Sequence, residues 1–189
     1  MDGSTLWAQN TAADAERREK NDFYPTPPEG TRALLAVERF EGPIWEPACG
    51  DGAISRVLQD AGYDVSSSDL IDRGYGEPRV DFLMEWKSRA PNIVTNPPFK
   101  LAQQFVERAL ALTTGKVAIL ARLAWLEGKA RRSMFEATPL ARVWVFSERL
   151  TMLRGGWDGG KGGGSMTAFA WFVWDHRHKG PPTLGWIAP

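Results

Sequence analysis

The residues best suited to chemistry are Asn96-Pro97-Pro98-Phe99, which follow a short apolar run and precede an amphipathic stretch. Proline has no backbone N–H and holds φ near about −65°, so two in succession make a rigid turn. Such a turn can hold the Asn96 side chain and the Pro97 carbonyl side by side as hydrogen-bond acceptors, a pair that suits an amino group. Phe99 adds a flat apolar face for a planar ring that carries an exocyclic amine. The plainer interpretation is an ordinary proline turn between a strand and a helix.

The elements on either side of this turn would place it at the edge of a sheet. Residues 92–95 form an apolar run that predicts a buried strand. In residues 101–112 apolar side chains recur at helical spacing, so one face of a helix would pack on the sheet. The turn between them therefore lies at the carboxyl edge, where open α/β sheets bind ligands.

A second strand, turn and helix comes earlier in the chain. Residues 43–48 predict a strand and residues 53–61 a helix, with Gly50 and Gly52 between them. Glycines at such a turn let backbone N–H groups and a helix N-terminus approach a ligand closely. The pattern is not the dinucleotide fingerprint, because Ser55 stands where the third glycine would be.

Residues 64–68 predict the next strand, and Asp69 follows at its end. An acid in that place, about 20 residues beyond a glycine turn, can accept hydrogen bonds from both hydroxyls of a ribose. The spacing strengthens the interpretation of the glycine turn as part of a cofactor site.

Four signals in this order resemble the amino-directed S-adenosylmethionine-dependent methyltransferases, and within them the adenine-N6 DNA enzymes. The signals are Phe23-x-x-Thr26-Pro27, Glu46-x-x-x-Gly50-x-Gly52, Asp69 and Asn96-Pro97-Pro98-Phe99. The resemblance runs from residue 22 to residue 174. With its small size and no inserted recognition domain, the sequence looks most like the short phage and prophage forms.

The resemblance implies a catalytic role for Asn96-Pro97-Pro98-Phe99 and a site for S-adenosylmethionine. In that site Asp81 would accept a hydrogen bond from the adenine amino group of the cofactor, and Phe82 would lie against its ring. A solvated loop acid and a core phenylalanine are the alternative roles of these two residues. The implied cofactor-binding residues are Phe23, Thr26, Pro27, Glu46, Ala48, Gly50, Gly52, Asp69, Asp81 and Phe82.

The remaining segments continue the alternation of strands and helices. Strands are expected at residues 79–83, 116–124, 142–146 and 167–174, and helices at residues 31–40 and 128–135. This order matches an α/β fold, the Rossmann-like seven-stranded methyltransferase sheet with helices on both faces and the last strand antiparallel. We expect one methyltransferase domain over residues 22–189, after a polar segment, residues 1–21, that is disordered or a short exposed helix.

The charge balance bears on the partner. The 189 residues contain 23 Lys and Arg and 23 Asp and Glu, so the net charge is zero and binding to DNA must rely on a local patch. A glycine-rich loop, residues 154–164, would become ordered on a target or be a solvated linker. The expected phosphate contacts are Lys129, Arg131, Arg132, Arg149, Arg154 and Lys161.

Composition argues against several other classes of protein. The sequence has no apolar run of about 18 residues and no charged-then-apolar leader, so neither a membrane span nor a signal peptide is expected. We expect a cytoplasmic protein, encoded by a phage if the resemblance extends so far. The single cysteine, Cys49, agrees with a reducing compartment. It does not resemble the nucleophile of cytosine-C5 enzymes, which directly follows a proline, because Ala48 lies between Pro47 and Cys49. His176 and His178 lack a third ligand, so no zinc site is expected.

The sequence therefore predicts transfer of a methyl group from S-adenosylmethionine to the N6 amine of adenine in DNA. The same turn also serves enzymes that methylate adenine in RNA or a glutamine amide in a protein, since each substrate presents a conjugated NH₂ group. A third alternative is a catalytically silent nucleic-acid-binding subunit with the same fold. The target sequence, the strand preference and the oligomeric state stay open.

Overall fold

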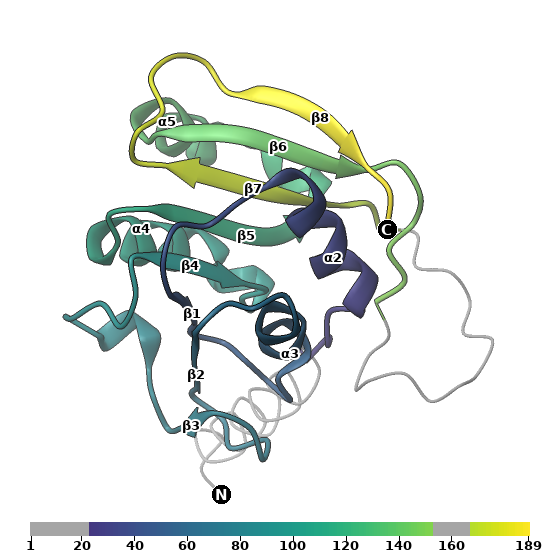
Figure 1. The fold of residues 1–189 in the computed structure, drawn as a ribbon. Helices are drawn as coiled ribbons and strands as arrows, with labels where there is room; N and C mark the ends of the chain where they lie inside the picture. Colours follow the sequence, from purple (N-terminus) through teal and green to yellow (C-terminus); the bar gives the residue numbers. More distant parts are fainter. Residues whose placement is uncertain (1–22, 153–166) are drawn as a thin grey trace, which may run out of the picture.

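The computed structural model describes residues 23–152 and 167–189 of the chain (Figure 1). Two segments considered above, the polar residues 1–21 and the glycine-rich loop with Arg154 and Lys161, lie outside the described residues.

Eight strands form one mixed sheet in the order β3-β2-β1-β4-β5-β7-β6-β8 (Figure 1). The strands are β1 (Ile44–Glu46), β2 (Val65–Asp69), β3 (Glu77–Pro78), β4 (Asn92–Thr95), β5 (Lys116–Arg122), β6 (Leu140–Phe146), β7 (Phe169–Asp175) and β8 (Thr183–Ile187). The first five strands are parallel to one another, and β7 is antiparallel to both β5 and β6. The carboxyl ends of β1, β2 and β4 consequently meet at one edge.

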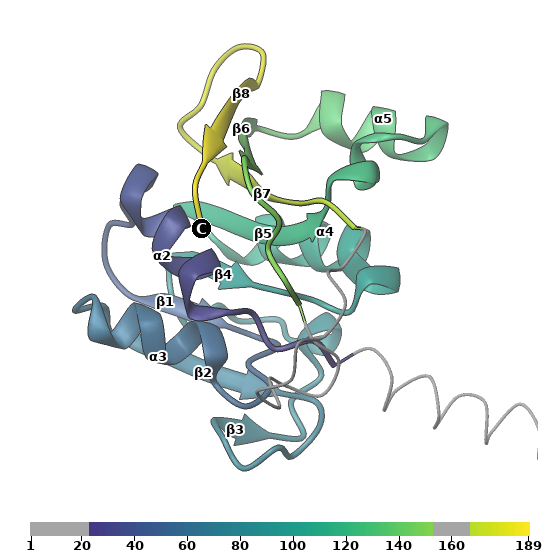
Figure 2. The same cartoon turned by 90° about the vertical axis from the view of Figure 1, so that its right-hand side faces the viewer.

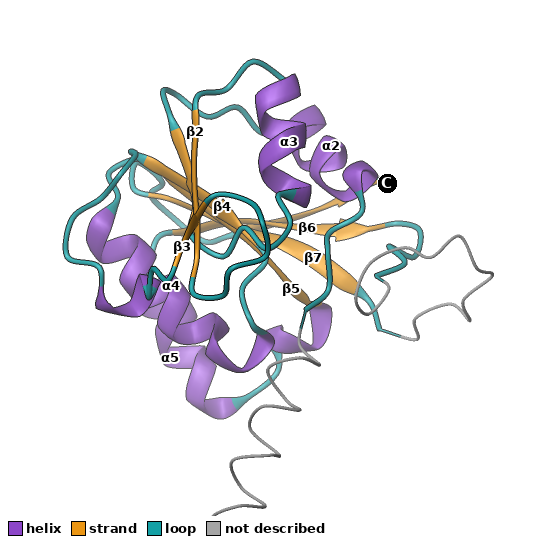
Figure 3. Cartoon of the chain, turned by 90° about the horizontal axis from the view of Figure 1, so that it is seen from below, coloured by secondary structure: helices purple, strands orange, loops and turns teal. Residues whose placement is uncertain are grey.

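Helices cover both faces of this sheet. They are α2 (Pro28–Val37), α3 (Ala53–Asp60), α4 (Ala102–Leu112) and α5 (Lys129–Ala137), with short 3₁₀-helices η1 (Phe82–Met84), η2 (Phe99–Leu101) and η3 (Leu123–Leu126). Figures 2 and 3 show α2 and α3 on one face and α4 and α5 on the other. The helices on both faces were predicted, and this feature is confirmed.

Alternation along the strands divides the core into two halves. In β5, Ala118 and Leu120 belong to the half that contains α2 and α3, whereas Val117 and Ile119 belong to the half that contains α4. All four side chains are fully buried. Because successive strand residues point to opposite faces, a continuous apolar strand of this kind needs a helical layer on each side.

The predicted number of seven strands is wrong, although the antiparallel seventh strand, β7, is confirmed. The additional strand, β8, pairs with β6 in parallel at the edge of the sheet. It follows Pro181 and Pro182 and has Gly185 at its centre, and both residue types are rare inside strands. Gly185 is required because a Cβ at this position would collide with the ring of Trp144, which a reading of local sequence cannot anticipate.

The strand expected at residues 79–83 is also wrong. The pairing strand β3 is shorter and earlier, and η1 follows it. The Asp81 carboxylate accepts a hydrogen bond from the Leu83 N–H at 3.0 Å, so it caps this 3₁₀ turn. A local side-chain bond of this kind competes with strand pairing. The helix expected at residues 31–40 begins earlier, at Pro28, since proline fits the first turn of a helix.

Candidate active site

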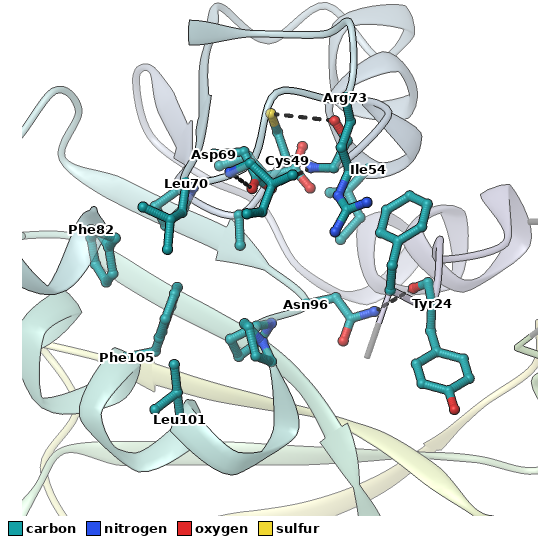
Figure 4. Close-up of a pocket in the computed structure, with 18 of the residues that line it drawn as sticks. Tyr24, Cys49, Ile54, Asp69, Leu70, Arg73, Phe82, Asn96, Leu101 and Phe105 are labelled. Atoms are coloured by element: carbon teal, nitrogen blue, oxygen red, sulfur yellow. Dashed lines mark hydrogen bonds between the residues drawn. The ribbon is translucent and has the colours of Figure 1, made fainter. Parts of the chain in front are cut away.

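A cavity of about 370 Å³ lies at the carboxyl edge of the sheet. Its walls come from the ends of β1, β2 and β4, from residues 23–26 ahead of α2, and from η1 and the start of α4. Figure 4 shows Asn96 and Tyr24 on one side of it and Phe82, Phe105 and Leu101 on the other, with Asp69 between them at the top. The turn and the glycine loop, far apart in the sequence, thus share one cavity.

The side-chain amide of Asn96 is held in one orientation. Its Nδ2 donates hydrogen bonds to the Tyr24 carbonyl at 3.0 Å and to the Thr26 hydroxyl at 3.1 Å (Figure 4). Because the Tyr24 carbonyl can only accept, it settles which end of the amide is nitrogen, so Oδ1 must be the other end. That Oδ1 atom is buried and has no hydrogen-bond partner in the part of the chain that the structure describes.

An acceptor left in this state is unfavourable unless something binds to it. A buried polar atom without a partner costs about 1–3 kcal/mol. Because Asn96 and Pro97 both line the cavity, a donor on a bound molecule can reach this place. The arrangement therefore suits a ligand that brings an N–H group to Asn96.

The ring of Phe99 is more enclosed than the sequence suggests. Tyr24 stacks on it with ring centroids 5.9 Å apart and an interplanar angle of 30°, and Phe169 lies at 5.9 Å. The guanidinium carbon of Arg122 lies 4.6 Å from the centre of the same ring. A planar ligand can stack on Phe99 only after one of these neighbours moves.

Both glycines of the loop have a positive φ and a close neighbour, and each of these features favours glycine. Gly50 has a φ of 57°, and a Cβ there would lie 2.5 Å from the Phe23 ring. Gly52 has a φ of 86°, and a Cβ there would lie 2.7 Å from the Tyr75 ring. Positive φ and close approach both favour glycine. Gly50 lines the cavity, whereas Gly52 supports the turn from behind and does not line it.

Asp69 lies where the end of β2 meets this loop. Its Oδ2 accepts a hydrogen bond from the Gly50 N–H and its Oδ1 one from the Ile71 N–H, both at 2.8 Å. An ionised carboxylate has about four acceptor sites, so two backbone bonds leave room for two more. The carboxylate is held in place and lines the cavity, ready for a pair of hydroxyl donors.

Glu46, at the end of β1, is the most deeply buried acid of the cavity wall, with 1% of its surface exposed. Burial raises its pKa well above 4.5, and the charges of Asp69 and Asp51 act in the same direction. A hydrogen bond from the Ser55 hydroxyl opposes this shift. Ser55 also lies 2.6 Å from the Ser67 hydroxyl, so a small hydrogen-bonded chain supports the acid. Sequence patterns did not reveal Ser55 or Ser67.

The opposite end of the cavity is apolar. Phe82 is 2% exposed and packs edge-on against Trp45 at 5.2 Å and tilted against Phe105 at 4.9 Å. Asp81 is exposed next to it, and one of its oxygens already caps η1. A flat apolar ring with an amino group at its edge would meet Phe82 and the free oxygen of Asp81. Phe105 of α4 is also part of this wall, whereas the sequence predicted only that one face of this helix packs on the sheet.

Cys49 also lines the cavity, but it is not a nucleophile in this setting. Burial raises the pKa of its thiol to about 12, and the charges of Glu46 and Asp69 add to the shift. The thiol therefore stays protonated at neutral pH, and a neutral thiol is a poor nucleophile.

The structure brings most of the predicted site residues together. All four residues of the turn line the cavity, and so do all the predicted cofactor-binding residues except Pro27 and Gly52. The roles of these residues stay predictions. Tyr24, Leu70 and Arg73 are additional lining residues that sequence patterns did not single out.

The residues predicted to contact phosphates do not lie at the cavity. Four of them are in the described part of the chain, and none of these four lines the cavity. Arg131 donates to the carbonyls of Trp125 and Glu127, and Arg132 pairs with Glu136 at 2.7 Å. Lys129 and Arg149 are exposed. Among the described residues, no group of three His, Cys, Asp or Glu could hold a metal ion, and no helix is long and apolar enough to cross a membrane.

The mixed α/β sheet, with helices on both faces and a cavity at the carboxyl ends of its parallel strands, defines a Rossmann-like fold. Solved structures of methyltransferases have a similar fold. The chain is similar to a candidate RNA methyltransferase from Pyrococcus horikoshii, with a TM-score of 0.57 and 14% identity over 82% of this chain and 87% of that one. It is also similar to the modification subunit of a candidate type I restriction enzyme from Vibrio vulnificus, with a TM-score of 0.56 and 16% identity over 95% of this chain and 50% of that one.

Other similar structures are methyltransferases with different substrates. The 23S rRNA methyltransferase ErmE gives a TM-score of 0.53 and 18% identity over 80% of this chain and 68% of that one. A magnesium protoporphyrin IX methyltransferase from Synechocystis with bound SAH gives a TM-score of 0.51 and 15% identity over 77% of this chain and 80% of that one. Neither a protein-family model nor a curated protein matches the sequence. The structural likeness establishes the fold, and the substrate must be argued from the site.

Proposed function

We propose that the protein transfers a methyl group from S-adenosylmethionine to the N6 amine of adenine in DNA. The observation that carries this proposal is the buried Oδ1 of Asn96, which is fixed in orientation and without a partner at the cavity. An amide oxygen in this state needs a donor, and an exocyclic amine is a donor. The adjacent carbonyl of Pro97, in the rigid turn, supplies a second acceptor.

The cavity fits S-adenosylmethionine along its length. When bound, this cofactor supplies a methyl group on a positively charged sulfur. Asp69 would accept from the ribose hydroxyls through its two free acceptor sites, while Phe82 and Asp81 would take the adenine ring and its amine. Phe23, Glu46 and Gly50 also line the cavity and would meet the amino-acid end of the cofactor. A methyltransferase of similar structure contains bound SAH, which supports S-adenosylmethionine as the cofactor.

The protein contributes position and electrostatics to the reaction. Asn96 Oδ1 and the Pro97 carbonyl would accept both N–H bonds of the target amine. This favours a pyramidal nitrogen, whose lone pair is then free of the purine ring and directed along the cavity. Acceptors that are already in place pay no reorganisation cost when the amine charge develops.

A nucleic acid is the substrate best supported by the surroundings of the turn. A base must leave its stack to reach Asn96, at a cost of a few kcal/mol, and stacking on an aromatic ring such as Phe99 offsets about 1–3 kcal/mol of this. The similar restriction-modification subunit favours DNA. Adenine in RNA is the second candidate, because two of the similar proteins are described as RNA methyltransferases.

Mass spectrometry of nucleosides tests the proposal directly. Genomic DNA and total RNA, each lacking N6-methyladenine, would be incubated with the protein and S-adenosylmethionine and then digested to nucleosides. We expect N6-methyl-2′-deoxyadenosine from DNA treated with the wild-type protein, and no such nucleoside from DNA treated with Asn96→Ala. Methylation of RNA and not of DNA would show that the substrate is the second candidate, adenine in RNA. Methylation of neither, in a protein that binds the cofactor, would refute the proposal and favour a glutamine substrate or a silent subunit.

A further inference from the structure

Arg122 is a cation beside the proline turn that the sequence analysis did not single out. It is the last residue of β5, it is exposed, and it pairs in register with Phe169 of β7. This pairing places its guanidinium over Phe99, 4.6 Å from the ring centre. The side chain of Arg122 makes no hydrogen bond or ion pair with the described part of the chain. Its five N–H donors are therefore available to a ligand.

Lys100 is a second available cation beside the same ring. It follows Phe99 directly in η2, it is exposed, and it lines the cavity. Like Arg122, it has no ion pair among residues 23–152 and 167–189. This distinguishes the two from Arg131 and Arg132, whose guanidinium groups are already bound to carbonyls and to Glu136.

The position of Arg122 has two consequences for a base that approaches Asn96. A base cannot stack on the covered face of Phe99 while the guanidinium stays there. A cation–aromatic contact at an exposed site is weak, so a stronger partner can displace it. A phosphate is such a partner, since it accepts two parallel N–H bonds from a guanidinium.

We propose that Arg122 and Lys100 bind the phosphates that flank the target nucleotide, and that Arg122 covers Phe99 until a phosphate draws it away. The inference rests on the proposed function and deepens it, because it assigns the substrate to the phosphodiester class. A protein glutamine offers no anion to either cation. Arg122 thus protects the apolar ring of the free protein and opens it only to a nucleic acid.

Binding of a fluorescent adenine-containing oligonucleotide at a series of salt concentrations tests this assignment. The variants are Arg122→Ala, Arg122→Lys and Lys100→Ala. The matched control is Lys179→Ala, which removes the same charge from an exposed residue in the turn after β7, at the opposite edge of the sheet. Each lost phosphate contact lowers the slope of log K against log salt by about 0.7–0.9. We expect that loss for Arg122→Ala and Lys100→Ala, and no loss for Arg122→Lys or Lys179→Ala.

Methyl transfer to two acceptors separates the phosphate role from a structural one. Arg122→Ala should lower transfer to the oligonucleotide about tenfold, and leave transfer to the nucleoside, which has no phosphate, unchanged or faster. Equal losses with both acceptors, or an unchanged salt slope for Arg122→Ala, would overturn the inference. If wild-type transfer to DNA is present at the same time, the proposed function survives. A wild-type protein that binds no oligonucleotide would overturn both.

Discussion

The Asn96 amide donates a hydrogen bond to the carbonyl of Tyr24, a residue 72 positions earlier in the chain, at 3.0 Å. The segment around Phe23-x-x-Thr26-Pro27 therefore orients Asn96, the proposed catalytic residue. Thr26 of the same segment accepts the second amide hydrogen at 3.1 Å. Residues 23–27, proposed above to contact the cofactor, thus also fix the Asn96 amide, so that Oδ1 is the end left for the proposed substrate.

Replacement of Asn96 by alanine should affect turnover and leave cofactor binding nearly unchanged. The lost acceptor matters most when charge develops on the amine, so we expect kcat to fall by about 100-fold or more. Steady-state kinetics with DNA and calorimetry with S-adenosylmethionine measure the two quantities. Losses of equal size in both would mean that Asn96 supports the structure of the turn.

Thr26→Val tests the orientation of the amide. The substitution keeps the shape of the side chain and removes one of the two acceptors that hold Asn96, so kcat should fall by about tenfold, a lost bond of roughly 1.4 kcal/mol. Thr31→Val is the matched control, because the Thr31 hydroxyl is buried and has no hydrogen-bond partner among the described residues. Thr31→Val should retain full activity and be equally or more stable in thermal unfolding. Equal activity of the two variants would argue against a role for Thr26.

Asp69→Ala should weaken the binding of S-adenosylmethionine. Bonds to a charged acceptor contribute about 1.5–3 kcal/mol each, so loss of the two proposed ribose bonds should raise Kd at least tenfold. Asp72→Ala is the control: Asp72 is an exposed acid of the neighbouring loop that caps the Gly74 N–H at 3.0 Å and does not line the cavity. Calorimetry should find its Kd unchanged. An unchanged Kd for Asp69→Ala, with the fold intact by circular dichroism, would exclude the ribose assignment.

Glu46 should make the stability of the cofactor-free protein depend on pH. Burial raises its pKa above the ordinary value of 4.5, so the folded protein binds this proton more tightly than the unfolded chain. The resulting stability is fully present below pH 4.5 and is lost as pH rises through the pKa of the folded state. Glu46→Gln keeps an acceptor for Ser55 but cannot lose a proton.

Urea unfolding from pH 4 to pH 9 measures this effect. The free energy of unfolding of Glu46→Gln minus that of the wild type should grow above pH 4.5, by up to about 1.4 kcal/mol per pH unit, and then level off. Other acids cancel in this difference. One of them is Glu38, where hydrogen bonds from Arg142 and Lys116 outweigh burial and lower the pKa. A difference that does not vary with pH would show that folding leaves the pKa of Glu46 unchanged.

The sequence by itself determined the local parts of the site. Proline restricts the turn after β4 within its own residues, and the positive φ of Gly50 and Gly52 is a property of the loop itself. Apolar periodicity acts over a few residues and predicted α3, α4 and most of the central strands. These constraints reach no further than one turn or one strand, so they could place the motifs on a sheet but not against one another.

Tertiary structure decided the contacts between distant segments. Pairing of β5 with β7 brings Arg122 over Phe99, and packing of Gly185 against Trp144 makes a strand of a segment rich in proline and glycine. Only the folded chain buries Asn96 Oδ1 with no partner in residues 23–152 and 167–189, while Tyr24 and Thr26 accept from the other end of the amide. A hydrogen bond between residues 72 positions apart depends on how the layers pack against each other. The free energy of that packing cannot be predicted from the local sequence pattern of either segment.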